Sequence, residues 1–338
     1  MKPFLQLKLI LTGVLLTAHP LPAADSQAQI GAPVLGYVFD PAAKGIRPVL
    51  GTPGASIVGD PLDLGVAVAW SVISPRQDFA IVAGADDATV RIVALPPGNF
   101  DSQILTTAAT ISNRIIFSPG GESAGWYQAD QAKLQVFTHL PHQPALAYEI
   151  DLTGVGGDLL SAAISDDGDL ALMLTGGQDN PTLWLSYAGT VPAQLPAPAA
   201  TATMSFRRSS QDAAMATRDG QVYLLQNLST GPNFLVLAPA DDRTSDPVAV
   251  QFSPDGQRVY VATRQGMVAG FGIRSEGATF ISCGCKPSGL FPLHSRMLIR
   301  LNEISDGPLM LLDTANPEPR IWFVPAAIAA AASDRSVQ

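Results

Sequence analysis

Charged residues and lysine are scarce in this sequence, and each shortage excludes a class of protein. Charged residues make up 14% of the 338 residues and hydrophobic residues 47%, which is too apolar for an intrinsically disordered chain. Only five of the twenty basic residues are Lys, and the formal net charge is -9. No basic patch with interleaved aromatic residues occurs, so we expect no nucleic-acid binding.

Short signatures of catalysis are also missing. The chain contains no G-x-S-x-G and no H-E-x-x-H pattern. Of the four histidines, His139 and His142 lie close together and flank a Leu-Pro pair. They are near enough to share a metal, but no acid or cysteine lies beside them in sequence, so we interpret them as loop histidines. We therefore assign no catalytic, cofactor-binding or metal-binding residue and expect no cofactor.

The chain has one pronounced apolar run, at its N-terminus. Lys2 and Lys8 supply positive charge, residues 9–16 are mainly apolar, and small residues follow at Ala23 and Ala24. This order predicts a secretory signal peptide over residues 1–24, because the run is too short to span a bilayer. Cleavage is expected near Ala24 or at Ala28, and an uncleaved anchor is the alternative. Cleavage would change the net charge from -9 to -11. We expect a periplasmic or secreted protein with no membrane span in the mature chain.

The segment Val250 to Ile273 (VQFSPDGQRVYVATRQGMVAGFGI) reads as three strands joined by two turns. Asp255-Gly256 provides the backbone freedom that a tight hairpin needs, and Gln265-Gly266 marks the second turn. The stretch RVYVAT between them is rich in β-branched and aromatic residues, which strands prefer.

Weaker copies of this segment recur along the chain. They are anchored by an apolar residue before each turn, at Ile73, Phe117, Ile164, Phe206, Phe252 and Leu290, with separations of 44, 47, 42, 46 and 38 residues. A period of this length with several strands per unit is typical of propeller blades. A fourth, outer strand fits in each gap. The pattern predicts an all-β propeller of four-stranded antiparallel blades over residues 31–325, as one domain, with seven blades favoured and six as the alternative.

Three stretches do not follow the repeat. Residues 34–40 and 46–51 are interpreted as the third and outer strands of a blade whose inner strands are absent or unrecognised. The sequence does not indicate which strands close the ring. The Pro-Ala-rich run 191–200 is interpreted as an outer strand with loops and not as a linker. Residues 326–338 are expected to form a C-terminal tail that includes a short helix.

The phrase FSPDGQRVYVATRQGMVAGFGI resembles the repeats of the YVTN/TolB-like and WD40-like propellers. Those families place a Ser-Pro-Asp-Gly turn between inner strands and follow it with a Val-Tyr-Val-Ala strand. The chain departs from true WD40 repeats, since it has no Gly-His or Trp-Asp dipeptide, and from TolB, since no separate α/β domain precedes the blades. The resemblance implies an exported bacterial propeller. Such families serve as binding platforms, as scaffolds in envelope complexes and, less often, as enzymes.

Cys283 and Cys285 are the two cysteines of the chain. In an oxidising compartment we predict a disulfide between them. Because it closes a very short loop, it restricts the unfolded chain little, so it would fix a loop rather than stabilise the fold. A reduced pair forming half of a metal site, with His294 as the nearest histidine, and a redox role are the alternatives.

Acidic clusters and tryptophans could also indicate a site. Asp166-Asp167-Gly168-Asp169 could bind Ca²⁺, but it aligns with the turn of the other repeats, so we interpret it as a solvated hairpin turn. The same interpretation applies to Asp86-Asp87, Asp241-Asp242 and Asp306-Gly307. The four tryptophans fall in predicted strands and are expected to pack the blades, at Trp70, Trp126, Trp184 and Trp322.

These observations predict an exported, non-catalytic propeller that binds a protein or a small molecule at its loop-rich face or central channel. One alternative is a lactonase-like or lyase-like enzyme, with acids and histidines converging at the channel. Another is a structural component of an envelope assembly or secretion complex. Fold alone does not decide among them.

Overall fold

The computed structural model describes residues 32–325, with gaps at residues 88, 97, 99, 107–113, 178, 199 and 275–276. The predicted signal peptide and the C-terminal tail lie outside the described residues. Within that part of the chain, the regular structure consists of β-strands and three short 3₁₀ helices. None of its helices has the length and hydrophobicity that crossing a bilayer requires.

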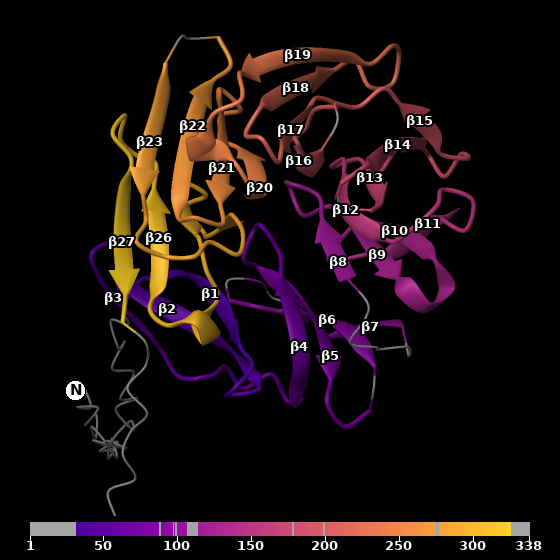
Figure 1. Ribbon diagram of the computed structural model, residues 1–338. Coiled ribbons are helices and arrows are strands. Elements are labelled where there is room, and N and C mark those ends of the chain that lie inside the picture. The colour runs from indigo at the N-terminus through magenta and orange to yellow at the C-terminus, as the bar shows by residue number, and fades with distance from the viewer. Residues whose placement is uncertain are drawn as a thin grey trace, which may run out of the picture. The chain divides into compact units, whose positions relative to one another are not determined.

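The described strands form seven antiparallel sheets in chain order, which are the blades of a propeller (Figure 1). Blade 1 has three strands and the other six have four, so the predicted seven-bladed fold is confirmed. The strands of the first four blades are β1 (Val34–Asp40), β2 (Gly45–Thr52), β3 (Ala55–Val58); β4 (Val68–Ile73), β5 (Phe79–Gly84), β6 (Val90–Ala94), β7 (Gln103–Thr106); β8 (Arg114–Phe117), β9 (Ala124–Gln128), β10 (Lys133–Thr138), β11 (Ala145–Asp151); β12 (Leu159–Ile164), β13 (Leu170–Gly176), β14 (Pro181–Tyr187), β15 (Ala193–Leu195).

Blades 5 to 7 follow the same order, and the three 3₁₀ helices lie in connecting loops. Their bounds are β16 (Thr201–Phe206), β17 (Ala213–Thr217), β18 (Val222–Gln226), β19 (Asn233–Ala238); β20 (Pro247–Phe252), β21 (Arg258–Thr263), β22 (Met267–Gly272), β23 (Ala278–Ser282); β24 (Phe291–Pro292), β25 (Leu298–Arg300), β26 (Leu309–Asp313), β27 (Arg320–Val324); η1 (Ala129–Gln131), η2 (Asp242–Thr244), η3 (Ile304–Asp306). The short β15 lies in the Pro-Ala-rich run, where an outer strand is predicted.

The repeated turn joins the first two strands of a blade through its own side chains. In blade 6, the Ser253 hydroxyl donates to Asp255 at 2.5 Å and accepts from the amide of Arg258 at 2.9 Å. The amide of Gln257 donates to the same Asp255 carboxylate at 3.0 Å. Gly256 adopts a φ of 66°, which glycine tolerates best. The Ser-Pro-Asp-Gly sequence is therefore a complete turn whose polar groups are satisfied locally.

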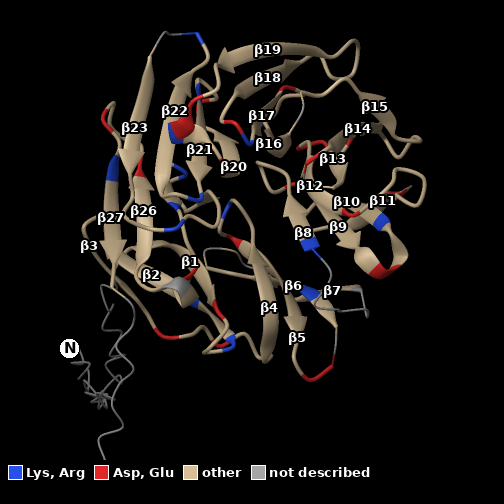
Figure 2. Cartoon of the chain, in the orientation of Figure 1, with Lys and Arg blue, Asp and Glu red and all other residues tan. Residues whose placement is uncertain are grey.

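The hydrophobic core is divided among the seven junctions between neighbouring blades. The described buried apolar residues fall into seven clusters, and each cluster joins two adjacent blades. The second strand of a blade has neighbours on both faces, so β5, β9 and β17 are buried at every position. Charged residues fall mainly in turns and at strand ends (Figure 2). Each blade is therefore stabilised by burial against the next blade in the ring.

The interpretation of the N-terminal strands as third and outer strands is wrong. β1 is the innermost strand of blade 1, β2 is the second, and β3 was not recognised from the sequence. The misassignment arose because a different turn joins β1 to β2. The Asp40 carboxylate accepts from the amides of Ala42 and Ala43 at 2.9 and 3.2 Å and pairs with Arg47 at 2.9 Å. These contacts replace the Ser-Pro-Asp-Gly turn, so the usual marker of an innermost strand is absent.

The ring closes by contact between blades 1 and 7, with no blade shared between the two ends of the described chain. Gln77, from the first turn of blade 2, accepts from the amide of Tyr37 at 2.6 Å and donates to the carbonyl of Pro292 at 2.8 Å. Blades 1, 2 and 7 are thereby joined by one side chain. Gly36 permits the approach, because a Cβ there would lie 2.8 Å from a methyl carbon of Leu293.

Candidate functional site

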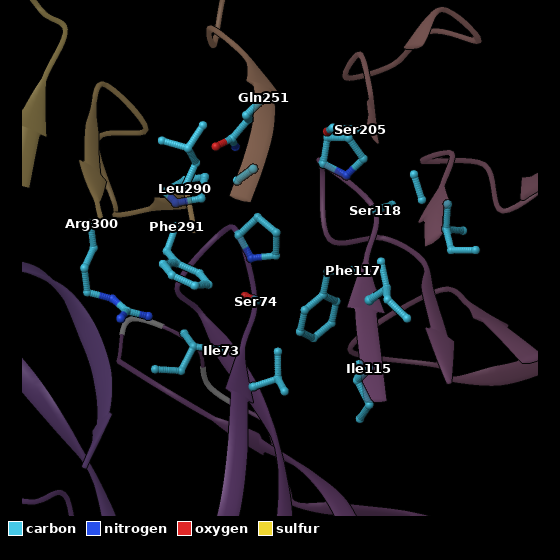
Figure 3. Close-up of a pocket in the computed structure, with 18 of the residues that line it drawn as sticks. Ile73, Ser74, Ile115, Phe117, Ser118, Ser205, Gln251, Leu290, Phe291 and Arg300 are labelled. Atoms are coloured by element: carbon cyan, nitrogen blue, oxygen red, sulfur yellow. The ribbon is translucent and has the colours of Figure 1, made fainter. Parts of the chain in front are cut away.

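A cavity of about 540 Å³ lies at the centre of the ring, and every blade contributes to its wall (Figure 3). Most of its lining residues belong to the innermost strands or directly precede them. One such residue from each blade is Tyr37, Ile73, Phe117, Ile164, Phe206, Val250 and Phe291. Five of the six predicted anchor residues line this cavity, and Phe252 lines a narrow gap beside it. The anchor residues were chosen because their spacing marks the blades, and most of them also prove to line the central cavity.

The wall of the cavity is mainly apolar, with scattered hydroxyl groups such as those of Ser71 and Ser161. Among the described lining residues, Arg300 and Glu303 carry charge. Their side chains pair with one another, since Arg300 Nη1 lies 2.6 Å from Glu303 Oε2. A wall of this kind suits a ligand that is mostly apolar and has few polar groups.

Arg300 is buried at the cavity wall and is held on two sides. Only 7% of the residue is exposed. Its guanidinium carbon lies 4.1 Å from the centre of the Phe291 ring, and Nη1 also donates to the carbonyl of Asn302 at 2.6 Å. Figure 3 shows the side chain extending from β25 past Phe291 toward Ile73. The stacking and the bonds to Nη1 fix the orientation of the guanidinium.

The turns between first and second strands surround a narrow gap that adjoins the cavity. Proline residues from four blades line it together with Arg208 and Arg296. Burial lowers the pKa of Arg296, and the nearby positive charge of Arg208 lowers it further. Arg76 acts in the same direction, whereas Glu122 and Asp166 oppose it. Three arginines thus lie near one end of the channel in a protein of net charge -9.

The Asp166 cluster forms a hairpin turn, as predicted, but Asp166 also joins three blades. Its two carboxylate oxygens accept from the amides of Gly120 in blade 3 and Ser209 in blade 5, at 2.6 and 2.7 Å. Asp167 stays within its own turn and accepts from the amide of Asp169 at 3.0 Å. Sequence alignment of the turns could not show the contacts of Asp166, because both partners lie more than 40 residues away.

His139 and His142 lie in the surface cleft that also contains Asp166, Asp167 and Asp169, a proximity that the sequence did not indicate. His139 Nδ1 lies 3.1 Å from the Thr138 hydroxyl, and the ring of His142 packs edge-on to Phe100. Across the described residues, no three His, Cys, Asp or Glu side chains are grouped so that they could hold a metal.

The remaining predicted residues lie away from the central cavity. Cys283 and Cys285 are joined in the structure with their Cα atoms 5.2 Å apart, beside the turn at Gly266. The oxidised state of this pair in solution stays a prediction, tested below. Asp87 and Asp241 accept from nearby backbone amides in their turns. The four tryptophans lie in β4, β9, β14 and β27, and each belongs to or packs on a core cluster.

Sequence reasoning missed Gln77 and Arg300. Gln77 occupies an ordinary turn position, so nothing in the sequence distinguishes it. Arg300 carried a signal, because it lies within the apolar run of a second strand. The same ladder position holds Ile81 in blade 2, Leu172 in blade 4 and Tyr260 in blade 6. A charged residue in a strand that must be buried on both faces indicates a partner or a ligand.

No protein-family model matches this chain, and no curated protein matches it either. Among solved structures, the chain is similar to a functionally unknown protein from Desulfotomaculum acetoxidans DSM 771. The two share 15% sequence identity with a TM-score of 0.57, over 86% of this chain and 100% of the other. At this identity the likeness concerns the fold alone. The chain is thus a seven-bladed β-propeller similar to a protein whose function is itself unknown.

Proposed function

We propose that this protein is an exported propeller that binds a small, largely apolar ligand in its central cavity and does not transform it. The observation that carries the proposal is the cavity of about 540 Å³, whose wall is mostly apolar and is built by all seven blades. Pockets that bind small molecules are commonly of this size and composition. We also propose that the repeats are of the YVTN/TolB-like kind, on the basis of the turn at Ser253 and Asp255.

Binding is better supported than catalysis by the cavity wall. A lactonase-like or lyase-like site would need several acids and histidines to converge. The described residues that line the cavity include one acid, Glu303, which is paired with Arg300, and no histidine. The proposal of a structural role in an envelope complex gains no comparable support from a particular surface.

The binding proposal can be tested with N-phenyl-1-naphthylamine, a neutral apolar dye that fluoresces when it leaves water. We expect saturable binding to the full mature protein. Replacing Ser161, which lines the cavity, with Phe should weaken binding at least about 10-fold because the phenyl group occupies ligand space. The control is Ser102→Phe, at an exposed position before β7. Equal affinity of both variants would overturn the proposal.

Export is proposed from the N-terminal residues alone and has its own test. The chain should be expressed in a Gram-negative bacterium, and the cell fractions should be separated. We expect the protein in the periplasm or medium, beginning after Ala24 or Ala28 by N-terminal sequencing. Recovery of the full-length chain from the cytoplasm would contradict it.

A further inference from the structure

Three residues of the cavity wall have a buried polar atom without a hydrogen-bond partner among the described residues. They are Ser71, through Oγ, Gln251, through Oε1, and Arg300, through Nε. Buried polar atoms in native proteins are nearly always hydrogen-bonded, to protein, water or a bound molecule. Their presence around one cavity indicates that the cavity's occupant supplies hydrogen bonds as well as apolar contact.

Arg300 defines what that occupant must offer. Its Nη1 already donates to Asn302 and Glu303. In a guanidinium group, Nη1 lies on the side of Cδ, whereas Nε–H and one N–H of Nη2 point together to the opposite side and form a fork. Neither Nε nor Nη2 donates a hydrogen bond to any described residue. The fork that remains matches the two oxygens of a carboxylate.

Charge and burial favour an anionic group over a neutral one. The side chain of Arg300 is 8% exposed and that of Glu303 is 38% exposed, so water reaches the acid far better than the guanidinium. A buried cation is costly unless its donors are paired. A ligand carboxylate at the Nε fork would complete the pairing on the desolvated side of Arg300.

The rest of the channel agrees with this chemistry. The cavity wall facing Arg300 is largely apolar: Ile73 lies beside the guanidinium, and Phe117 faces the same space from across the cavity (Figure 3). Leu290 also lines this cavity. At the adjoining gap, Arg208 and Arg296 form no ion pair with a described residue. Positive groups at the end of a channel increase the local concentration of anions in an otherwise acidic protein.

We propose that the Nε fork of Arg300 binds the carboxylate of a small molecule whose remaining part is apolar and fills the central cavity. The inference rests on the proposed binding function and names the ligand class. Stacking on Phe291 and the bond to Glu303 set the fork in place, and the apolar wall receives the body of the ligand.

The test compares decanoate with decanamide, which has the same chain and a neutral head group, as competitors for N-phenyl-1-naphthylamine on the full mature protein. We expect decanoate to compete about 10- to 100-fold more strongly, the range that a charge-assisted pair confers. Arg300→Lys keeps the charge but loses the fork, so it should remove most of this preference. Arg258→Lys is the matched control, since Arg258 also has an unpartnered Nε but does not line the cavity.

The outcomes separate the two proposals. If the dye binds but decanoate and decanamide compete equally in the wild-type protein, cavity binding stands and the carboxylate inference is wrong. The inference is also wrong if Arg300→Lys keeps the full preference for decanoate. If the dye and both competitors fail to bind, both proposals are overturned. The wild-type comparison does not depend on any variant, so it decides the question even if Arg300→Lys does not fold.

Discussion

Gln77 should be essential for closing the ring, and replacing it with Met tests this directly. Only 4% of Gln77 is exposed, and its amide bridges the backbone of Tyr37 and Pro292. Met has nearly the same length and volume but cannot make either bond. Gln77 has a φ of 64°, and Met would meet the same backbone strain there, so the substitution isolates the two hydrogen bonds.

The magnitude follows from the two backbone groups that lose their partner. A buried donor or acceptor left without a partner costs about 1–3 kcal/mol. Gln77 also lines the central cavity, so water can replace part of the loss. We therefore expect Gln77→Met to lower the free energy of unfolding by about 2–4 kcal/mol. Gln257 lies in the equivalent turn of blade 6 and is exposed, so Gln257→Met should change it by less than about 0.5 kcal/mol.

Two measurements check this prediction. Urea unfolding followed by tryptophan fluorescence gives the midpoint for each variant, and hydrogen exchange reports on the Tyr37 amide itself. We expect an earlier midpoint and faster exchange in β1 for Gln77→Met alone. If both variants unfold at the same urea concentration with equal exchange at Tyr37, the bridge does not hold the ring, and closure rests on apolar packing between blades 1 and 7.

Three further predictions concern other contacts. Replacing Asp166 with Ala should lower the free energy of unfolding by about 2 kcal/mol, because two amides in neighbouring blades lose a charged acceptor. The control Asp179→Ala, in an exposed turn, should leave it unchanged, and urea unfolding distinguishes the two variants. Burial lowers the pKa of His294, although Asp78 opposes this. As the pH drops, the unfolded chain therefore takes up a proton before the folded one, and the free energy of unfolding should fall below about pH 6.5. Thermal unfolding should show a smaller loss of stability at low pH in His294→Phe. Iodoacetamide should label Cys283 and Cys285 in the purified protein only after reduction, and labelling without reductant would contradict the disulfide.

The sequence was sufficient to predict the blades because their pattern is local. The spacing of Ile73, Phe117 and Phe206 follows from the length of four short strands and their turns, and each strand has its own β-branched and aromatic residues. These features act over a few residues and repeat, so errors in one copy are corrected by the others. The seven-bladed fold and most strands could therefore be predicted without knowledge of any tertiary contact.

What the sequence could not show is which residues meet across blades. Asp166 was interpreted as a solvated turn residue because its own turn explains it, yet its oxygens bind amides 46 and 43 residues away. β1 was misplaced because its turn uses Asp40 and Arg47 in place of the repeated Ser-Pro-Asp-Gly. The Asp166 contacts are pairings over long separations, which the repeat does not encode and which a single sequence does not reveal. The β1 turn is local, but its sequence departs from the repeat, so it could not be matched to the other copies.

The two charged residues of the cavity wall, Arg300 and Glu303, belong to blade 7, where the repeat is weakest, and a physical reason connects the two facts. β24 has two residues, whereas the innermost strands of blades 2, 4, 5 and 6 have six. A shorter innermost strand covers less of the second strand behind it, so Arg300 at the end of β25 reaches the cavity beside Phe291. A regular blade would place an apolar residue there and shield it. The shortened innermost strand of blade 7 thus accounts both for the weak repeat in this blade and for the charged group in the channel.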